Sequence, residues 1–186
     1  EKRQKATNIR IIVAAVLVVV ILLGFMFGSN YFAGLRVEAV QKMSVDSDKT
    51  LQEYFTTEQI TAVGEYGQTA IKKLNRTLEK EIDEDGPVAT KNNLIAGIAY
   101  TFSKNSHMTT SYDTLQLLRK IFNKNDGNLN RKFAVQALAY IPNGDKELNA
   151  IIKSKLMDAE ISLIALNALP KSKTGKVPAE VLLFAL

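Results

Sequence analysis

The sequence predicts an all-α protein that begins with a single transmembrane helix, and three observations support this fold class. An uncharged apolar run extends from Ile11 to about Gly28. Between residues 58 and 82, apolar residues recur mostly at steps of three and four, the spacing of one buried helical face. Residues 130–142 align without gaps on residues 158–170, so a helical segment is repeated along the chain.

Composition limits the classes of function. The formal charge is +5, but residues 1–10 account for +3 of it, and the charges that follow are mixed in sign. A basic surface of the kind that binds nucleic acid is therefore not expected. The chain has no cysteine and one histidine, which excludes disulfides, thiolate nucleophiles and sulfur-based zinc sites. We predict a non-enzymatic protein without cofactor, and we assign no catalytic, cofactor-binding or metal-binding residue.

The N-terminal segment has the features of a membrane anchor. Eighteen apolar residues in a helix span about 27 Å, close to the hydrocarbon thickness of a bilayer. We expect a basic cytoplasmic flank at residues 1–10 and a transmembrane helix with its interfacial end at 11–35, where Tyr31 and Phe32 reach the headgroup depth. By the positive-inside rule, the N-terminus lies in the cytoplasm and the domain lies outside it, at the cytoplasmic (inner) membrane.

A cleaved secretory signal is the alternative interpretation of this segment, because it also has a basic start and an apolar stretch. The run here is longer than a usual signal core, and no small-x-small cleavage site follows Phe27. We therefore expect the segment to be retained.

Residues 36–89 are expected to form a helical tether and packing helices. Val37, Val40 and Met43 have helical spacing, and a polar break follows at residues 44–50. The helix predicted over residues 58–82 has Thr57 as its N-cap, and Gly86-Pro87 ends it.

The internal repeat is the most informative pattern in the second half of the chain. At an offset of 28 residues, like side chains align: Phe133/Ile161, Val135/Leu163, Ala137/Ala165, Leu138/Leu166, Ile141/Leu169 and Pro142/Pro170. A fainter copy lies at residues 97–102, and each copy leads into a second apolar segment, around residues 112–122, 148–156 and 179–186. A period of roughly 30 to 45 residues with two helices is what a stacked α-solenoid requires.

Over about residues 90–186 the chain resembles HEAT-like repeats of the short bacterial type. The pattern of that family, a polar N-cap followed by x-x-apolar-Ala-x-x-Ala-Leu, fits residues 130–138 and, with Ser162 in place of Ala, residues 158–166. The resemblance implies a helical-repeat domain that binds proteins. An irregular helical bundle is the alternative fold.

Two turns have ligand-type residues but do not fit a binding loop. Residues 81–86 carry acids at alternate positions before Gly86, as in a calcium loop, but Pro87 and Asn92 occupy later ligand positions. Residues 123–128 fit less well. We interpret the first as a solvated acidic turn and the second as a turn between helices.

Other short motifs also receive a structural interpretation. His107 lies in a polar loop at residues 103–111 and is expected to be a surface residue, and residues 171–176 only superficially resemble a phosphate loop. The glycosylation pattern at residues 75–77 falls inside a predicted helix, so we regard it as chance. Gly24 and Gly28 form a small-xxx-small pair that is compatible with, but not specific for, helix packing in the membrane.

These features favour a single-pass scaffold or accessory subunit, whose extracytoplasmic helical-repeat domain binds protein partners of a membrane complex while the N-terminal helix contacts the lipid bilayer. The alternative is the extracytoplasmic sensor part of a transmembrane signalling or anti-sigma-like regulator, with a cytoplasmic part before Glu1.

Overall fold

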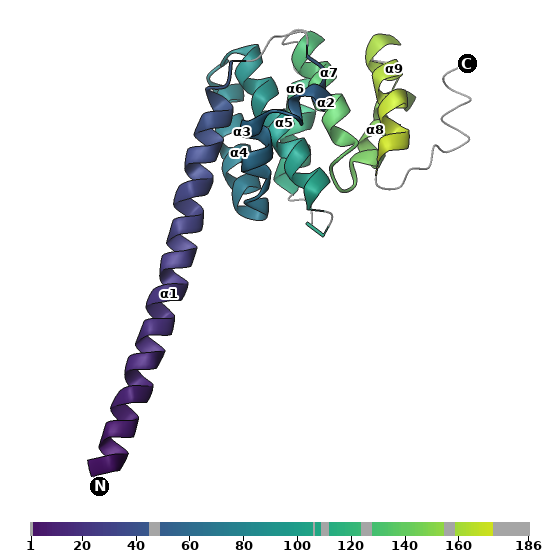
Figure 1. Ribbon diagram of the computed structural model, residues 1–186. Helices are drawn as coiled ribbons and strands as arrows, with labels where there is room; N and C mark the ends of the chain where they lie inside the picture. The colour runs from purple at the N-terminus through teal and green to yellow at the C-terminus, as the bar shows by residue number, and fades with distance from the viewer. Residues whose placement is uncertain are drawn as a thin grey trace.

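The computed structural model describes residues 2–44, 49–105, 107–108, 112–123, 128–154 and 159–172, and every regular element within them is a helix (Figure 1). In chain order the elements are α1 (Lys2–Gln41), α2 (Leu51–Tyr54), α3 (Glu58–Gly64), α4 (Gly67–Asp83), α5 (Val88–Lys104), α6 (Tyr112–Asn123), α7 (Asn128–Leu138), α8 (Gly144–Lys153), α9 (Ala159–Ala168) and the 3-10 helix η1 (Leu169–Lys171). The all-α prediction is confirmed for this part of the chain.

Helix α1 extends far beyond the other helices (Figure 1). Its 40 residues correspond to about 60 Å of length. The large apolar side chains from Val13 to Leu23 are all exposed, so this stretch is apolar around its circumference. Within the described residues, α1 is the one helix long and apolar enough to cross a membrane, and it lies near the N-terminus as predicted. Such a surface is suited to lipid rather than to water.

The last turns of α1 belong to the helical domain. Ala33, Val37 and Val40 are buried, where α1 packs on α3, α4 and α5. Gly97 on α5 makes this close approach possible, because a Cβ atom there would lie 3.3 Å from Leu74 and 3.6 Å from Val40. The apolar segment and the domain are therefore joined by one unbroken helix, which ends at Gln41.

Residues 58–82 form two helices instead of the single predicted one. Helix α3 ends at Gly64, and α4 begins at Gly67, whose φ of +48° is strained for residues with a side chain. The predicted apolar face is nevertheless buried in both helices, namely Ile60, Val63, Ala70, Ile71, Leu74, Leu78 and Ile82. The spacing misses the break because the apolar period continues across it.

The N-cap predicted at Thr57 and the stop predicted at Gly86-Pro87 can be compared with the observed ends of α3 and α4. Thr57 occupies the N-cap position of α3, but its hydroxyl donates to the Tyr54 carbonyl at 2.7 Å and accepts no helix amide. At the end of α4, Asp85 has a φ of +54° and the Gly86 amide donates to the Glu81 carbonyl at 2.7 Å. This is a Schellman-type end, and it turns the chain into α5 as Gly86-Pro87 predicted.

The helices of the domain pack in two layers. One layer contains α5, α7 and α9 in succession, with α3 beside α5, and the other contains α4, α6 and α8. Pairs of neighbouring helices connect the layers, because α4 packs on α5, α6 on α7 and α8 on α9. Aromatic rings connect α2 and the residue after it to this domain: Tyr54 makes an edge contact with Phe133, and Phe55 makes edge contacts with Tyr100 and Tyr140.

The two copies of the internal repeat correspond to α7 and α9, which pack against each other. Equivalent residues Phe133/Ile161, Ala137/Ala165 and Ile141/Leu169 are buried in both copies. Val135 is buried, whereas its counterpart Leu163 is 56% exposed. The second segments predicted at residues 112–122 and 148–156 correspond to α6 and α8, and residues 179–186 lie outside the described part. Helix α7 packs more closely on α6, which precedes it, than on α8, which follows it.

Candidate functional site

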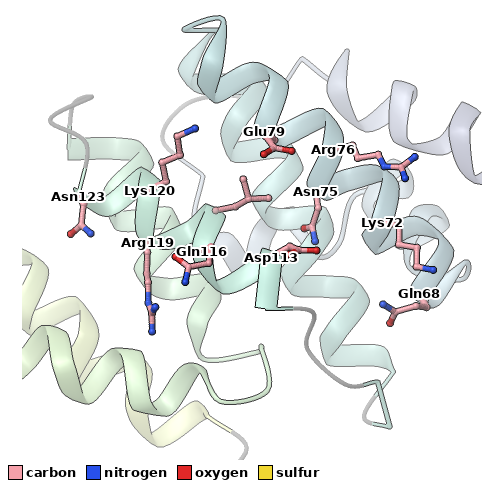
Figure 2. Close-up of a pocket in the computed structure, with 11 residues that line it drawn as sticks. Gln68, Lys72, Asn75, Arg76, Glu79, Asp113, Gln116, Arg119, Lys120 and Asn123 are labelled. Atoms are coloured by element: carbon pink, nitrogen blue, oxygen red, sulfur yellow. The ribbon is translucent and has the colours of Figure 1, made fainter.

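A polar groove of about 850 Å³ lies between α4 and α6, and we consider it as a candidate site on the described part of the domain (Figure 2). It is lined by Gln68, Lys72, Asn75, Arg76, Glu79, Asp113, Gln116, Leu117, Arg119, Lys120 and Asn123. We call this set the α4/α6 groove. Ten of the eleven side chains are polar, so the groove is suited to a hydrophilic segment rather than an apolar one.

The amphipathic pattern of α4 explains why its polar residues line the groove. Gln68, Lys72, Arg76 and Glu79 follow one another at three- and four-residue steps and share one face. The opposite face contributes Ala70, Ile71, Leu74 and Leu78 to the core. The groove residues of α6 have the same spacing, because its apolar residues are also directed to the core.

A buried hydrogen bond joins the two helices at the floor of the groove. Asn75 is 7% exposed, and its Nδ2 donates to Thr114 Oγ1 at 2.8 Å. In Figure 2 the Asn75 side chain points toward α6, beside Asp113. A glycan on Asn75 would require the helix pair to separate, which agrees with interpreting the motif at residues 75–77 as chance.

Ion pairs fix both α4 and α8 to α6. Lys120 Nζ lies 2.5 Å from Asp83 Oδ1 at the end of α4. The Arg119 guanidinium contacts both carboxylate oxygens of Glu147 on α8, with Nε donating to Oε2 at 2.6 Å. A two-point arginine–carboxylate contact defines orientation better than a single lysine contact does. The nearly buried Glu147 therefore sets the position of α8 relative to α6.

Four charged groups of the groove are not engaged in these contacts. Within the described residues, Lys72, Arg76, Glu79 and Asp113 form no ion pair. Lys72 and Arg76 point away from α6 in Figure 2. Two cations and two anions are thus available to a partner, and a partner with both signs of charge would match them.

The acidic turn at residues 81–86 connects elements of the fold. Glu81 accepts a hydrogen bond from Gln41 Nε2 on α1 at 2.7 Å, Asp83 pairs with Lys120, and Asp85 lies 4.0 Å from the buried amine of Lys91. Glu84 lies 3.9 Å from Lys80, so each of the four acids has a different partner and their oxygens do not converge. Among the described residues no cluster of potential metal ligands is present.

The other motifs do not assemble into a site in the described residues. His107 is exposed in the connection after α5. Residues 171 and 172 end the described part of the chain, so residues 173–176 and most of the turn at 123–128 lie outside it. Gly24 and Gly28 have nothing within 4 Å of a Cβ built on either residue.

Sequence reasoning missed the α4/α6 groove. The polar stripe on α4 was visible as the complement of its apolar face, but its apposition to α6 depends on tertiary packing. Comparison with known proteins finds no family model, curated protein or solved structure that matches this chain.

Proposed function

We propose that this protein is a single-pass, membrane-anchored scaffold or accessory subunit whose helical domain binds protein partners of a membrane complex. The observation that carries the proposal is the continuity of α1. This helix passes without a break from a stretch that is exposed and apolar on all sides to a stretch whose Ala33, Val37 and Val40 are buried in the domain. The anchor therefore holds the domain at the membrane.

The layered helices support binding as the role of the domain. Successive packing of α5, α7 and α9 beside α4, α6 and α8 is the arrangement expected of a HEAT-like α-solenoid, and the 28-residue correspondence of α7 and α9 agrees with it. Such stacks provide extended surfaces that bind proteins. We propose that this role is non-enzymatic and that the domain lies outside the cytoplasm.

The α4/α6 groove is the proposed contact surface. Its available groups, Lys72, Arg76, Glu79 and Asp113, offer both signs of charge beside amide side chains. This chemistry fits a polar protein segment that contains acids and bases. Two cations balanced by two anions do not provide the excess of positive charge that binding to a nucleic-acid backbone requires.

Crosslinking of the gently extracted native protein, followed by mass spectrometry, tests this proposal. Lys72 and Lys120 in the groove are the reporters, and Lys132 and Lys153 report on the neighbouring helices α7 and α8. Recurrent crosslinks from these lysines to one membrane complex would support the scaffold. Crosslinks confined to the chain itself, with no partner retained, would contradict it.

Charge reversal then tests the groove. Arg76→Glu should release the crosslinked partner, because it replaces an available cation by an anion. Lys49→Glu, at an exposed position before α2, is the matched control and should retain the partner. Equal retention by both variants would exclude the groove as the contact surface.

An extracytoplasmic sensor is a second candidate, and the same continuity of α1 favours it. A helix that is rigid from the membrane to the core transmits a movement of the domain directly to the membrane segment. A ligand-dependent change in the crosslinking of α1 to itself, without any partner complex, would favour the sensor over the scaffold.

A further inference from the structure

The helices of the domain have a defined direction relative to α1. Gly34 of α1 lies beside the amine of Lys73, and Gln41 bonds to Glu81, so α1 and α4 run side by side in the same direction. The Asn75–Thr114 and Asp83–Lys120 contacts show that α6 also runs this way. The first turns of α4 and α6 therefore lie at the end of the domain nearest the apolar part of α1. We call this the membrane-facing end.

The last turn of α5 belongs to the same end. Helix α5 packs on α4 after the short turn at residues 84–87 and returns in the opposite direction. Asn105, which follows it, donates from Nδ2 to the carbonyl of Gly64 at 3.1 Å, beside the start of α4. Lys104, at the end of α5, is exposed there.

The depth of this end follows from the rise of the helices. Gly67 precedes Glu81 by about 14 residues, and Glu81 is level with Gln41, so Gly67 is level with about residue 27 of α1. The hydrocarbon-spanning part predicted from the sequence ends at about Gly28. A layer of polar headgroups some 5–7 Å thick covers the hydrocarbon on each side. α1 has no break that would lift the domain away, so with the boundary at Gly28 the start of α4 would lie at the hydrocarbon edge of this layer, and Lys72, five residues later, would lie within it.

The charges of α4 are divided along its length. Lys72, Lys73 and Arg76 lie in the half nearer the apolar part of α1, whereas three acids (Glu79, Glu81 and Asp83) and one base (Lys80) lie toward the far end. This order opposes the helix dipole, which favours acids at the start of a helix and bases at its end. The stability of the isolated helix therefore does not account for it. A contact of these bases with lipid phosphates would be favourable, although the exposed carboxylates of Glu65 and Asp113 lie at the same end.

We propose that the membrane-facing end of the domain docks on the lipid headgroups, with Lys72, Lys73 and Lys104 at the level of the phosphates. The occupant of this surface is the bilayer that α1 crosses, so the inference rests on the proposed membrane anchoring. Docking fixes the tilt of the domain and leaves the far ends of its helices, including the acidic turn at residues 81–86, directed away from the membrane.

Depth measurements on the full chain in vesicles test this docking. Because the sequence has no cysteine, single labels can be placed at Val18→Cys in the apolar stretch, at His107→Cys in the membrane-facing end and at Glu84→Cys at the far end. Vesicles of phosphatidylglycerol and phosphatidylcholine carry a nitroxide quencher either on the headgroup or on the acyl chain. The headgroup quencher should reduce the fluorescence at position 107 and leave position 84 unaffected, while the acyl quencher should act at position 18.

Neutralising the lysines tests the contact with phosphate. Lys72→Gln, Lys73→Gln and Lys104→Gln together should lower headgroup quenching at position 107 about twofold in anionic vesicles. The matched control, Lys42→Gln, Lys49→Gln and Lys80→Gln, removes the same charge at the far side and should leave the quenching unchanged. Added salt should reproduce the effect of the first set.

The outcomes separate the two proposals. Quenching at position 18 without preferential quenching at position 107 would overturn the docking and leave the anchor intact. Lack of acyl quenching at position 18 would overturn the anchoring itself. Equal headgroup quenching in both lysine sets would show that helix geometry alone places the domain there, and it would overturn the phosphate contact.

Discussion

At the scale of single residues, Asn75 is the polar group most deeply involved in the candidate site. It lies at the floor of the α4/α6 groove and donates to Thr114 within the packed interface. Removing one partner of a buried hydrogen bond costs more than the bond itself contributes, because the remaining group loses its partner and stays dehydrated. Asn75 thus connects the stability of the domain to the shape of the groove.

Asn75→Ala is expected to lower the free energy of unfolding by about 1–3 kcal/mol. Thermal melting followed by circular dichroism in mild detergent measures this change. The neighbouring Arg76→Ala, at an exposed position on the same helix, serves as the control and should change it by less than about 0.5 kcal/mol. Equal changes in the free energy of unfolding for the two substitutions would show that the Asn75–Thr114 hydrogen bond contributes no measurable stability.

Glu53 provides a pH-dependent contribution at the start of α2. The backbone amide and hydroxyl of Thr50 donate to its carboxylate and hold the pKa of Glu53 below its ordinary value. The pKa of Glu53 is lower in the folded state than in the unfolded state. Its contribution to the stability of the folded state is therefore complete above the unfolded-state pKa and is lost as pH falls through the folded-state pKa.

Glu53→Gln should therefore reduce the loss of stability that the native chain shows as pH falls into the acid range. The difference in melting temperature between the native chain and Glu53→Gln should be larger at neutral pH than at pH values below the folded-state pKa. Thr50→Ala removes the hydroxyl donor and should reduce the same difference. A constant offset at every pH would contradict this role of the capping box.

At the scale of elements, the junction between α1 and the domain is the decisive contact. Val40 is fully buried in it, whereas Arg36 on the same helix is exposed. An apolar side chain at position 40 is required because α4 and α5 surround it closely, as the short approach at Gly97 shows.

Val40→Asp should destabilise the domain by at least about 3 kcal/mol, because it buries a carboxylate without a partner. Arg36→Asp introduces the same side chain at an exposed position of the same helix and should leave the melting temperature nearly unchanged. Protease susceptibility of residues 36–50 gives a second measurement. If both variants melt alike, α1 is not part of the domain core.

The success of sequence reasoning also differs between elements. The apolar stretch of α1, the buried face of α4 and the stop at Gly86-Pro87 depend on local patterns, and the structure agrees with them. The break at Gly67 was missed because Val63, Ala70 and Ile71 keep the helical spacing across it. The groove and the roles of Glu81 and Asp83 depend on contacts with residues about 40 positions away, which periodicity does not reveal.

At the scale of the whole molecule, the proposed membrane insertion and its orientation are the main properties to determine. The basic residues before the apolar run predict a cytoplasmic N-terminus. In intact bacterial cells, a membrane-impermeant maleimide should label Glu84→Cys at once and Gln4→Cys only after permeabilisation. The reverse pattern would place the domain in the cytoplasm, and the groove would then meet cytoplasmic partners.

α1 lies at one edge of the helical layers and not beneath their centre (Figure 1), so a protein anchored as proposed would be asymmetric in the plane of the bilayer. In the proposed orientation, the domain overhangs the membrane surface on one side of α1, and none of the described helices lies on the other side (Figure 1). A neighbouring membrane protein with a bulky extramembrane part therefore has free access to α1 from the uncovered side only. Such a neighbour would reach Gly24 and Gly28 only where they face that open side, so in the proposed orientation the domain would restrict sterically which membrane proteins can pack against α1.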